Sequence, residues 1–161
     1  MTIRTALSTD LQAISAVEAA CFPPAEAADA AAFAGRLACY RSHFLLMLDD
    51  DGRLLSFVDG FCTDEPDLTD EMYEHAELHN EQGAWQMIFG VNTLPGYRRQ
   101  GLAGTLLRQF IADARAQGRR GLVLTCKAEK IHWYASFGFE NEGPSASVHG
   151  GAVWYQMRLT F

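Results

Sequence analysis

The stretch LPGYRRQGLAGTLL, residues 94–107, places a proline turn, two arginines and two glycines directly before an apolar helical pattern. The first N–H groups of a helix have no intrahelical acceptor, and the helix dipole adds positive potential there. A helix start of this kind suits an anion. Gly101 and Gly104 let the backbone approach that anion closely, and Arg98 and Arg99 add charge-assisted contacts. The stretch therefore predicts an anion-binding turn followed by a helix.

The residues beyond this turn predict a helix, a strand, a short helix and a last strand. The first helix has an apolar stripe at helical spacing and ends at Gly118; the stripe consists of Leu102, Leu106, Phe110 and Ala114. Residues 121–126, GLVLTC, are continuously apolar, as in strands that are covered on both faces. Residues 130–137 predict a short aromatic helix, and the alternation in residues 152–161 predicts a half-buried strand.

The residues before the turn also predict a mixture of strands and helices. Their patterns predict a strand at 2–6, helices at 8–22 and 25–41, a hairpin at 43–62 around Asp51-Gly52, an acidic helix at 64–82 and a strand at 84–93. This order of elements predicts an α/β fold with one domain over residues 1–161. We expect a mixed central sheet of about six to seven strands, flanked by helices on both faces.

The composition excludes several classes of protein. With 161 residues, 48% hydrophobic and 20% charged, the chain has enough apolar sequence for one sizeable core. The formal net charge of -7 argues against a nucleic-acid partner or an anionic membrane surface. The four cysteines are widely spaced, and neither a secretory leader nor a membrane-spanning segment is visible. We expect reduced thiols and a cytoplasmic location; a homodimer is left open.

Arg98-Arg99-Gln100-Gly101-Leu102-Ala103 resembles the R/Q-x-x-G-x-G/A pyrophosphate motif of the GNAT N-acetyltransferase superfamily, with Ala103 at the second glycine. VNTLPGYRRQGLA is similar to the strand and helix that carry this motif, and WYASFGFENEGPS to the tyrosine-bearing helix of the family. The resemblance covers nearly the whole chain. EAACFPPAEAA and FGFENEGPSASVHGG are most similar to the arylalkylamine N-acetyltransferase branch.

This resemblance implies acetyl-CoA as the cosubstrate. It places the pantetheine arm along Val91, Asn92 and Thr93, and the pyrophosphate at Arg98, Arg99, Gln100, Gly101, Leu102, Ala103, Gly104 and Thr105. In the arylalkylamine branch an early proline-containing loop helps to form the amine pocket. The corresponding candidates for amine binding are Phe22, Pro23, Pro24 and His149.

Acetyl transfer to an amine also requires proton transfers. An alkylammonium with a pKa near 10.4 is neutral in roughly one molecule of a few thousand at pH 7, so a proton acceptor is useful. A phenol can protonate the departing thiolate, and Tyr134 matches the general acid of the family. Residues 85–89 lack the histidine pair of the animal enzymes of this branch, so no base is carried over. The open candidates are His79, His132, His149 and Glu65, or a chain of waters.

No metal is expected. His75 and His79 stand at i, i+4 and Cys62 is near in sequence, but no third ligand is fixed by spacing. The sequence thus predicts an acetyl-CoA-dependent N-acetyltransferase that acts on a small primary amine. Two alternatives remain: a catalytically silent sensor of acyl-CoA, and a peptide or protein N-acetyltransferase. The last needs an open groove, whereas residues 64–82 are expected to cover the site.

Overall fold

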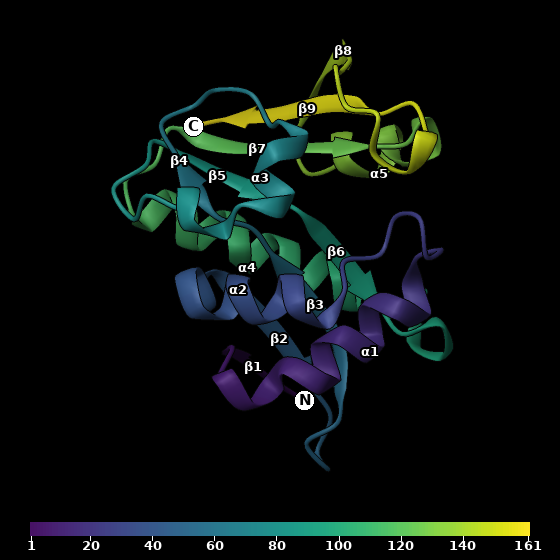
Figure 1. Cartoon of the computed structure of the whole chain (residues 1–161). Helices are drawn as coiled ribbons and strands as arrows, with labels where there is room; N and C mark the ends of the chain where they lie inside the picture. Colours follow the sequence, from purple (N-terminus) through teal and green to yellow (C-terminus); the bar gives the residue numbers. More distant parts are fainter.

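The computed structural model describes residues 1–161 and arranges nine strands in two sheets (Figure 1). The first sheet is antiparallel, with the order β1-β2-β3-β6. Its strands are β1 (Thr2–Thr5), β2 (Phe44–Leu48), β3 (Leu54–Asp59) and β6 (Gly90–Thr93). The second sheet has the order β4-β5-β7-β9-β8, in which only β5 and β7 are parallel. Its strands are β4 (Cys62–Thr63), β5 (Trp85–Ile88), β7 (Gly121–Cys126), β8 (Glu140–Pro144) and β9 (Tyr155–Thr160).

Helices cover both faces of the first sheet. The five α-helices are α1 (Leu11–Cys21), α2 (Ala30–Tyr40), α3 (Asp70–Glu74), α4 (Leu102–Ala116) and α5 (Ile131–Ala135). α1 and α2 pack against each other and over β3 on one face, while α4 packs against β2 and β3 on the other (Figure 1). No helix combines the length and the apolar character needed to cross a bilayer.

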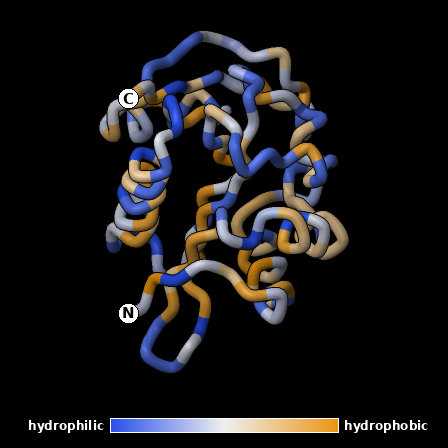
Figure 2. The backbone as a smooth tube through the Cα atoms, turned by 90° about the vertical axis from the view of Figure 1, so that its left-hand side faces the viewer, coloured by the Kyte–Doolittle hydropathy of each residue, from blue (hydrophilic) through white to orange (hydrophobic).

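This sandwich explains the continuous apolar runs of the sequence. All five residues of β2 are buried, and they alternate between two cores. Phe44 and Leu46 face the core beneath α1 and α2, whereas Leu45 and Met47 face the core beneath α4. Figure 2 shows the hydrophobic chain in the middle of the molecule and the hydrophilic turn between β2 and β3 at its lower end. The α/β fold with helices on both faces is therefore confirmed.

The structure differs from the sequence prediction at several elements. The expected strand at 84–93 is broken at Phe89 into β5 and β6, which belong to different sheets. The expected acidic helix at 64–82 is wrong, because only the short α3 and a 3-10 turn at Ala76–Leu78 form there. β8 was not predicted. α2 begins at Ala30 and β9 at Tyr155, later than expected in both cases.

Candidate functional site

The break at Phe89 opens the site. The N–H of Phe89 donates to the carbonyl of Asp59 at 2.7 Å. At this hydrogen bond the chain leaves the second sheet and begins to pair with β3. β5 pairs with β7 only as far as Ile88, opposite Leu124, and β6 then pairs with β3. β6 and β7 therefore diverge: β6 is the free edge of its sheet, and β7 has no partner from β5 beyond Leu124. An extended ligand can reach the free backbone groups of β6 there.

A cavity of about 1480 Å³ occupies this divergence. Its walls come from the α1–α2 connection, α3, β6, β7, the start of α4 and α5. Pockets for one small ligand usually measure about 300–1,000 Å³. The cavity therefore has room for two ligands side by side.

The start of α4 forms one end of the cavity. Gly101 caps the helix with φ +79°, and Arg99 also has a positive φ of 65°. The N–H groups of Leu102, Ala103 and Gly104 open the helix, where no intrahelical acceptor exists, and all three residues line the cavity. Arg98, Arg99, Arg108 and Lys130 also line this end. The predicted anion-binding turn thus faces the cavity.

Most of the residues predicted for the site lie on the cavity wall. These are Phe22, Pro23, Val91, Thr93, Arg98, Arg99, Gly101, Leu102, Ala103, Gly104, Tyr134 and His149. Pro24, Asn92, Gln100 and Thr105 are not part of the wall. Asn92 points to the opposite side of β6 from Val91 and Thr93, because side chains alternate along a strand. The N–H and the hydroxyl of Thr105 both donate to the carbonyl of Gly101, so they are not free for a ligand.

Tyr134 reaches the cavity from α5. Its ring lies edge-on to Trp133 and Phe139, which fixes its orientation. Burial, with smaller contributions from Cys126 and Tyr73, raises the pKa of Tyr134 well above its ordinary value. The hydroxyl therefore keeps its proton throughout the physiological range and can donate a hydrogen bond there.

Glu18 is a functional candidate that sequence reasoning missed. It projects from α1 into the cavity with only 7% of its surface exposed. One carboxylate oxygen accepts the N–H of Ala28 at 2.9 Å. Burial is the main cause that raises the pKa of Glu18 to about 7. Asp59 raises this pKa further, while Ala28, Arg36 and the nearby Asn92 amide oppose the shift. Glu18 is thus a carboxyl that titrates near neutral pH inside the cavity.

A simple pattern in α1 would have identified Glu18. Ile14, Val17 and Glu18 stand at i, i+3 and i+4, and all three are buried. They therefore share the face of α1 that is turned toward the core. A charged side chain on such a face is rarely fully buried without a partner or a function.

None of the bases proposed from the sequence is placed as well as Glu18. Glu65 and His132 are exposed and are not part of the cavity wall. His79 lies in a separate cluster described below. His149 lines the cavity, but its Nε2 faces the carbonyl of Glu26 at 2.8 Å and therefore donates to it.

The loop between β8 and β9 closes the end of the cavity opposite to the α4 turn. The N–H of Val148 donates to Asp70 at 3.0 Å, and His149 donates to the backbone of Glu26. The His149 ring stacks on Tyr73, with centroids 5.3 Å apart and planes at 12°. These contacts join the loop to α3 and to the α1–α2 connection. α3 and this loop, rather than a long helix over residues 64–82, cover this end.

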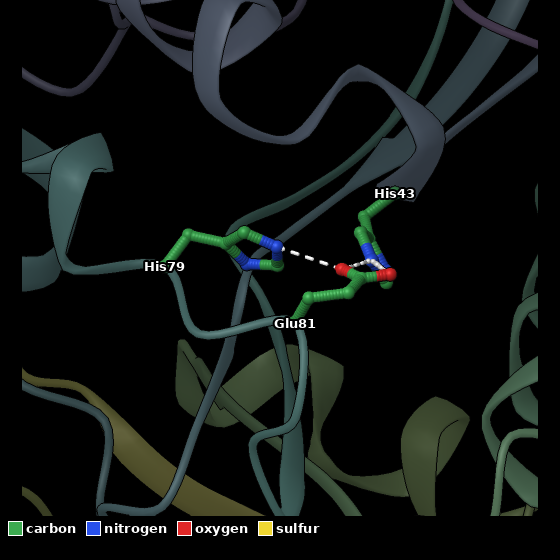
Figure 3. A group of neighbouring side chains, drawn as sticks. All are labelled: His43, His79 and Glu81. Atoms are coloured by element: carbon green, nitrogen blue, oxygen red, sulfur yellow. Dashed lines mark hydrogen bonds and ion pairs between the residues drawn. The ribbon is translucent and has the colours of Figure 1, made fainter.

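A second polar cluster lies outside the large cavity and joins His43, His79 and Glu81 (Figure 3). Their ligand-type atoms lie within 4.8 Å of one another, a spacing that can suit a metal. However, Nδ1 of His79 accepts the N–H of Cys62 at 3.0 Å, so the proton of the neutral ring lies on Nε2, which faces Glu81. Nε2 then has no lone pair for a metal. The hydrogen bonds identify a structural cluster, tied to β5 through His43 and Gln86.

The pairing of His75 with His79 that the sequence allowed is wrong. His75 is exposed and bonds to Glu77 at 2.8 Å, whereas His79 turns toward His43. The two rings separate because α3 ends at Glu74, so residues 75 and 79 do not share a helical face.

Comparison with known proteins identifies the family. The sequence profile of the acetyltransferase (GNAT) domain matches residues 41–141, more than half of the chain. The chain belongs to the GNAT acetyltransferase family. It is 27% identical over 112 residues to the serotonin N-acetyltransferase of Mesocricetus auratus. That match covers 69% of this chain and 53% of the relative, so the chain spans about half of the relative's length.

Solved structures share the fold of this GNAT chain. The GphF GNAT-like decarboxylase in complex with isobutyryl-CoA has a TM-score of 0.86 at 20% identity, with 99% of both chains covered. A GNAT family acetyltransferase from Brucella melitensis in complex with acetyl-CoA has a TM-score of 0.63 at 20% identity. In that comparison 99% of this chain and 87% of the other are covered.

Acetyl-CoA is the cosubstrate that membership of the GNAT family implies, and the residues present fit it. The free edge of β6 can hydrogen-bond an extended amide-containing arm, and the start of α4 offers N–H groups and arginines to a pyrophosphate. Gly101 is required by its positive φ, since a side chain there costs about 1–2 kcal/mol.

Gly101→Asp is expected to weaken CoA binding about 10- to 100-fold while the fold is retained. The backbone strain alone corresponds to about tenfold, and the new carboxylate repels the pyrophosphate. Nothing lies within 4 Å of a Cβ at this position, so packing is not disturbed. Isothermal titration calorimetry with CoA measures the effect, and Gly96→Ala, at another open position, is the matched control. A folded Gly101→Asp protein with the parent affinity would contradict this role for the turn.

Proposed function

We propose that this protein transfers the acetyl group of acetyl-CoA to a small cationic primary amine, with Glu18 as the general base. The observation that carries the proposal is the buried Glu18 carboxyl on the cavity wall, where burial raises its pKa to about 7. A general base with a pKa near the working pH is largely ionised and still has a high affinity for a proton. The similarity to serotonin N-acetyltransferase supports an amine as the acceptor.

Bound acetyl-CoA supplies an acetyl group on a thioester, which a neutral amine can attack. The acceptor enters as an ammonium ion, and the ionised Glu18 takes one of its protons, directly or through one water. Glu18 becomes a neutral carboxylic acid, which its buried position tolerates. Ala28 holds the other oxygen in place by its N–H, so the acceptor side of the carboxyl is oriented before the amine arrives.

Tyr134 acts on the opposite side of the reacting carbon in this proposal. When the tetrahedral intermediate collapses and the C–S bond breaks, the Tyr134 hydroxyl passes its proton to the leaving sulfur, and the second proton lost by the nitrogen replaces it. The raised pKa of Tyr134 keeps the phenol protonated at every pH at which Glu18 is ionised. The base and the hydrogen-bond donor are therefore available together.

The walls of the cavity favour a short cation over a peptide. Glu18, Asp70 and Glu74 line its acceptor end and attract an ammonium group, whereas the Glu26 carboxylate is paired with Lys127 at 2.9 Å. Phe22, Tyr73 and Phe89 line the same end and can contact an aromatic or alkyl tail. Because the loop between β8 and β9 is bound to α3 and to the α1–α2 connection, a long chain has no open groove.

A panel of acceptors tests the proposed substrate class. Arylalkylamines and alkyl diamines are expected to outperform amino acids, whose carboxylate the acidic end repels, and to outperform peptides with a free N-terminus. Phe22→Ala should raise the Michaelis constant for an arylalkylamine about tenfold through lost apolar contact, with the constant for acetyl-CoA unchanged. The measurement is the initial rate of thiol release at varied amine and fixed acetyl-CoA.

Phe161→Ala is the control, because Phe161 lies at the chain end and is not part of the cavity wall. An amino acid or a peptide as the best acceptor would contradict the proposed class. An unchanged Michaelis constant for the amine in Phe22→Ala would remove the α1–α2 connection from the amine pocket.

A further inference from the structure

Asp59 is a fully buried carboxyl that lies directly behind Glu18. It ends β3, and its side chain has no exposed surface. Oδ2 accepts hydrogen bonds from the Arg36 guanidinium at 3.2 Å and from the Tyr40 hydroxyl at 3.0 Å. Oδ1 accepts none from any group of the protein. The two oxygens of this carboxyl are therefore in different situations, and one of them lacks a partner.

The unpaired oxygen lies in the same small region as the free oxygen of Glu18. Asp59 Oδ1 lies 3.3 Å, and Glu18 Oε1 3.8 Å, from the point where a Cβ on Gly90 would stand. Asn92 Nδ2 lies 3.1 Å from the same point, and neither polar atom of the Asn92 side chain has a hydrogen-bond partner within the protein. Each carboxyl thus has one bonded oxygen and one oxygen near Gly90, with the Asn92 amide beside them, and Asp59 acts on Glu18 through its charge.

We propose that Asp59 is a positioning residue that acts through Glu18, and that the two buried carboxyls bind their protons as one coupled pair. This inference rests on the proposed role of Glu18 as the base. Arg36 and Tyr40 stabilise negative charge on Asp59 Oδ2. The first proton that the pair binds therefore goes to Glu18 or to Asp59 Oδ1. The proton that Glu18 takes from the acceptor therefore neutralises a like-charge repulsion.

Four groups from the elements packed around Glu18 act on its carboxyl. These are the Arg36 guanidinium of α2, the Asp59 carboxyl of β3, the Asn92 amide of β6 and the Ala28 N–H of the α1–α2 connection. Burial and Asp59 raise the pKa of Glu18, whereas the other three lower it. Removing Asp59 and removing Asn92 should therefore shift the ionisation of Glu18 in opposite directions.

The test is a carbon-13 NMR titration of the glutamate carboxyls in the protein without substrates, with Glu18→Gln to assign the signal. Asp59→Asn should lower the titration midpoint of Glu18 by about one pH unit, since a like charge is removed. Asn92→Leu should raise the midpoint, because a dipole that favours the ionised form is replaced by an apolar side chain of similar size. The acidic limb of kcat/KM against pH should move with each midpoint.

Asp51→Asn is the matched control. Asp51 is exposed in the turn between β2 and β3 and is not part of the cavity wall, so the Glu18 midpoint should stay in place. A role in packing alone would move neither midpoint. If Asp59→Asn leaves the midpoint unchanged, or if both variants shift it in the same direction, the coupling is overturned.

Glu18→Gln carries the test if Asp59→Asn does not fold, because a coupling between two sites is reciprocal. A lower titration midpoint of the Asp59 carboxyl in Glu18→Gln than in the parent then supports the coupling, and an unchanged Asp59 midpoint overturns it. The titration needs no turnover. Shifted midpoints in a protein that acetylates no amine would therefore contradict the proposed function and leave the coupled pair intact.

Discussion

Glu18→Gln is expected to lower kcat/KM for the amine by about 10²- to 10⁴-fold, the usual contribution of a general base. In the parent protein kcat/KM should rise with pH through about 7, because only the ionised Glu18 accepts a proton. The variant should lose this limb. The side-chain amide can still accept the N–H of Ala28, so the local structure has no reason to change. The measurement is kcat/KM between pH 5.5 and 9 with acetyl-CoA saturating.

Glu71→Gln is the control for the loss of one carboxylate, since Glu71 lies exposed on α3 and is not part of the cavity wall. It should keep both the rate and the limb near pH 7. A Glu18→Gln protein with the parent profile would show that another group, or water alone, accepts the proton.

Glu18→Gln should also stabilise the fold at high pH. The pKa of Glu18 is about 7 in the folded protein and near 4.5 in the unfolded chain. Between pH 4.5 and pH 7 the folded state therefore binds one more proton than the unfolded state. The resulting stabilisation is complete below about pH 4.5 and is lost as the pH rises through 7. Glu18→Gln removes this loss and should raise the free energy of unfolding at pH 8 by about 3 kcal/mol. Stability and activity thus oppose each other at this position.

Tyr134→Phe is expected to lower kcat by about 10²- to 10⁴-fold with little change in the Michaelis constant for acetyl-CoA. The substitution removes one hydroxyl and keeps the ring that packs edge-on against Trp133 and Phe139. Only the hydrogen bond to the departing sulfur is lost. Pre-steady-state rates of thiol release, under conditions where chemistry limits turnover, measure the effect.

Tyr155→Phe removes a hydroxyl from a half-buried tyrosine of β9 outside the cavity and should leave the rate unchanged. If the chemical rate of Tyr134→Phe equals that of the parent, Tyr134 only packs against its aromatic neighbours.

The sequence predicted those elements whose own pattern decides their structure. The helix from Leu102 and the strand at 121–126 form at the expected positions. An apolar stripe at helical spacing specifies the helix, and a short, continuously apolar run specifies a strand that is covered on both faces. The turn at Asp51-Gly52 also forms as predicted, with Gly52 at φ +82°. The anion-binding turn followed from these local signals together.

Elements that depend on distant contacts were not predictable in this way. The break at Phe89 results from pairing with β3, which lies about 30 residues earlier in the chain. Residues 64–82 carry helical spacing, yet Leu68 and Asp67 bond to Gln156 of β9, which holds this segment extended before α3. β8 contains Gly143 and Pro144 and has no apolar alternation, so only its pairing with β9 defines it as a strand.

The catalytic assignment was limited for the same reason. Tyr134 followed from a family motif, whereas the base had no motif to identify it. The proposed role of Glu18 depends on burial and on Asp59, Arg36 and Asn92, which come from three other elements. Such an environment exists only after folding.

The most direct test of the central claim is the stoichiometry of a single reaction. The protein is incubated with acetyl-CoA and phenethylamine at pH 8, and free CoA thiol and acetylated amine are quantified together by mass spectrometry. The account predicts equal amounts of both products, no thiol release above the hydrolytic background without the amine, and loss of both products in Glu18→Gln. Tight CoA binding without amine-dependent thiol release, for every amine of the panel, would contradict it and identify the chain as a silent acyl-CoA sensor.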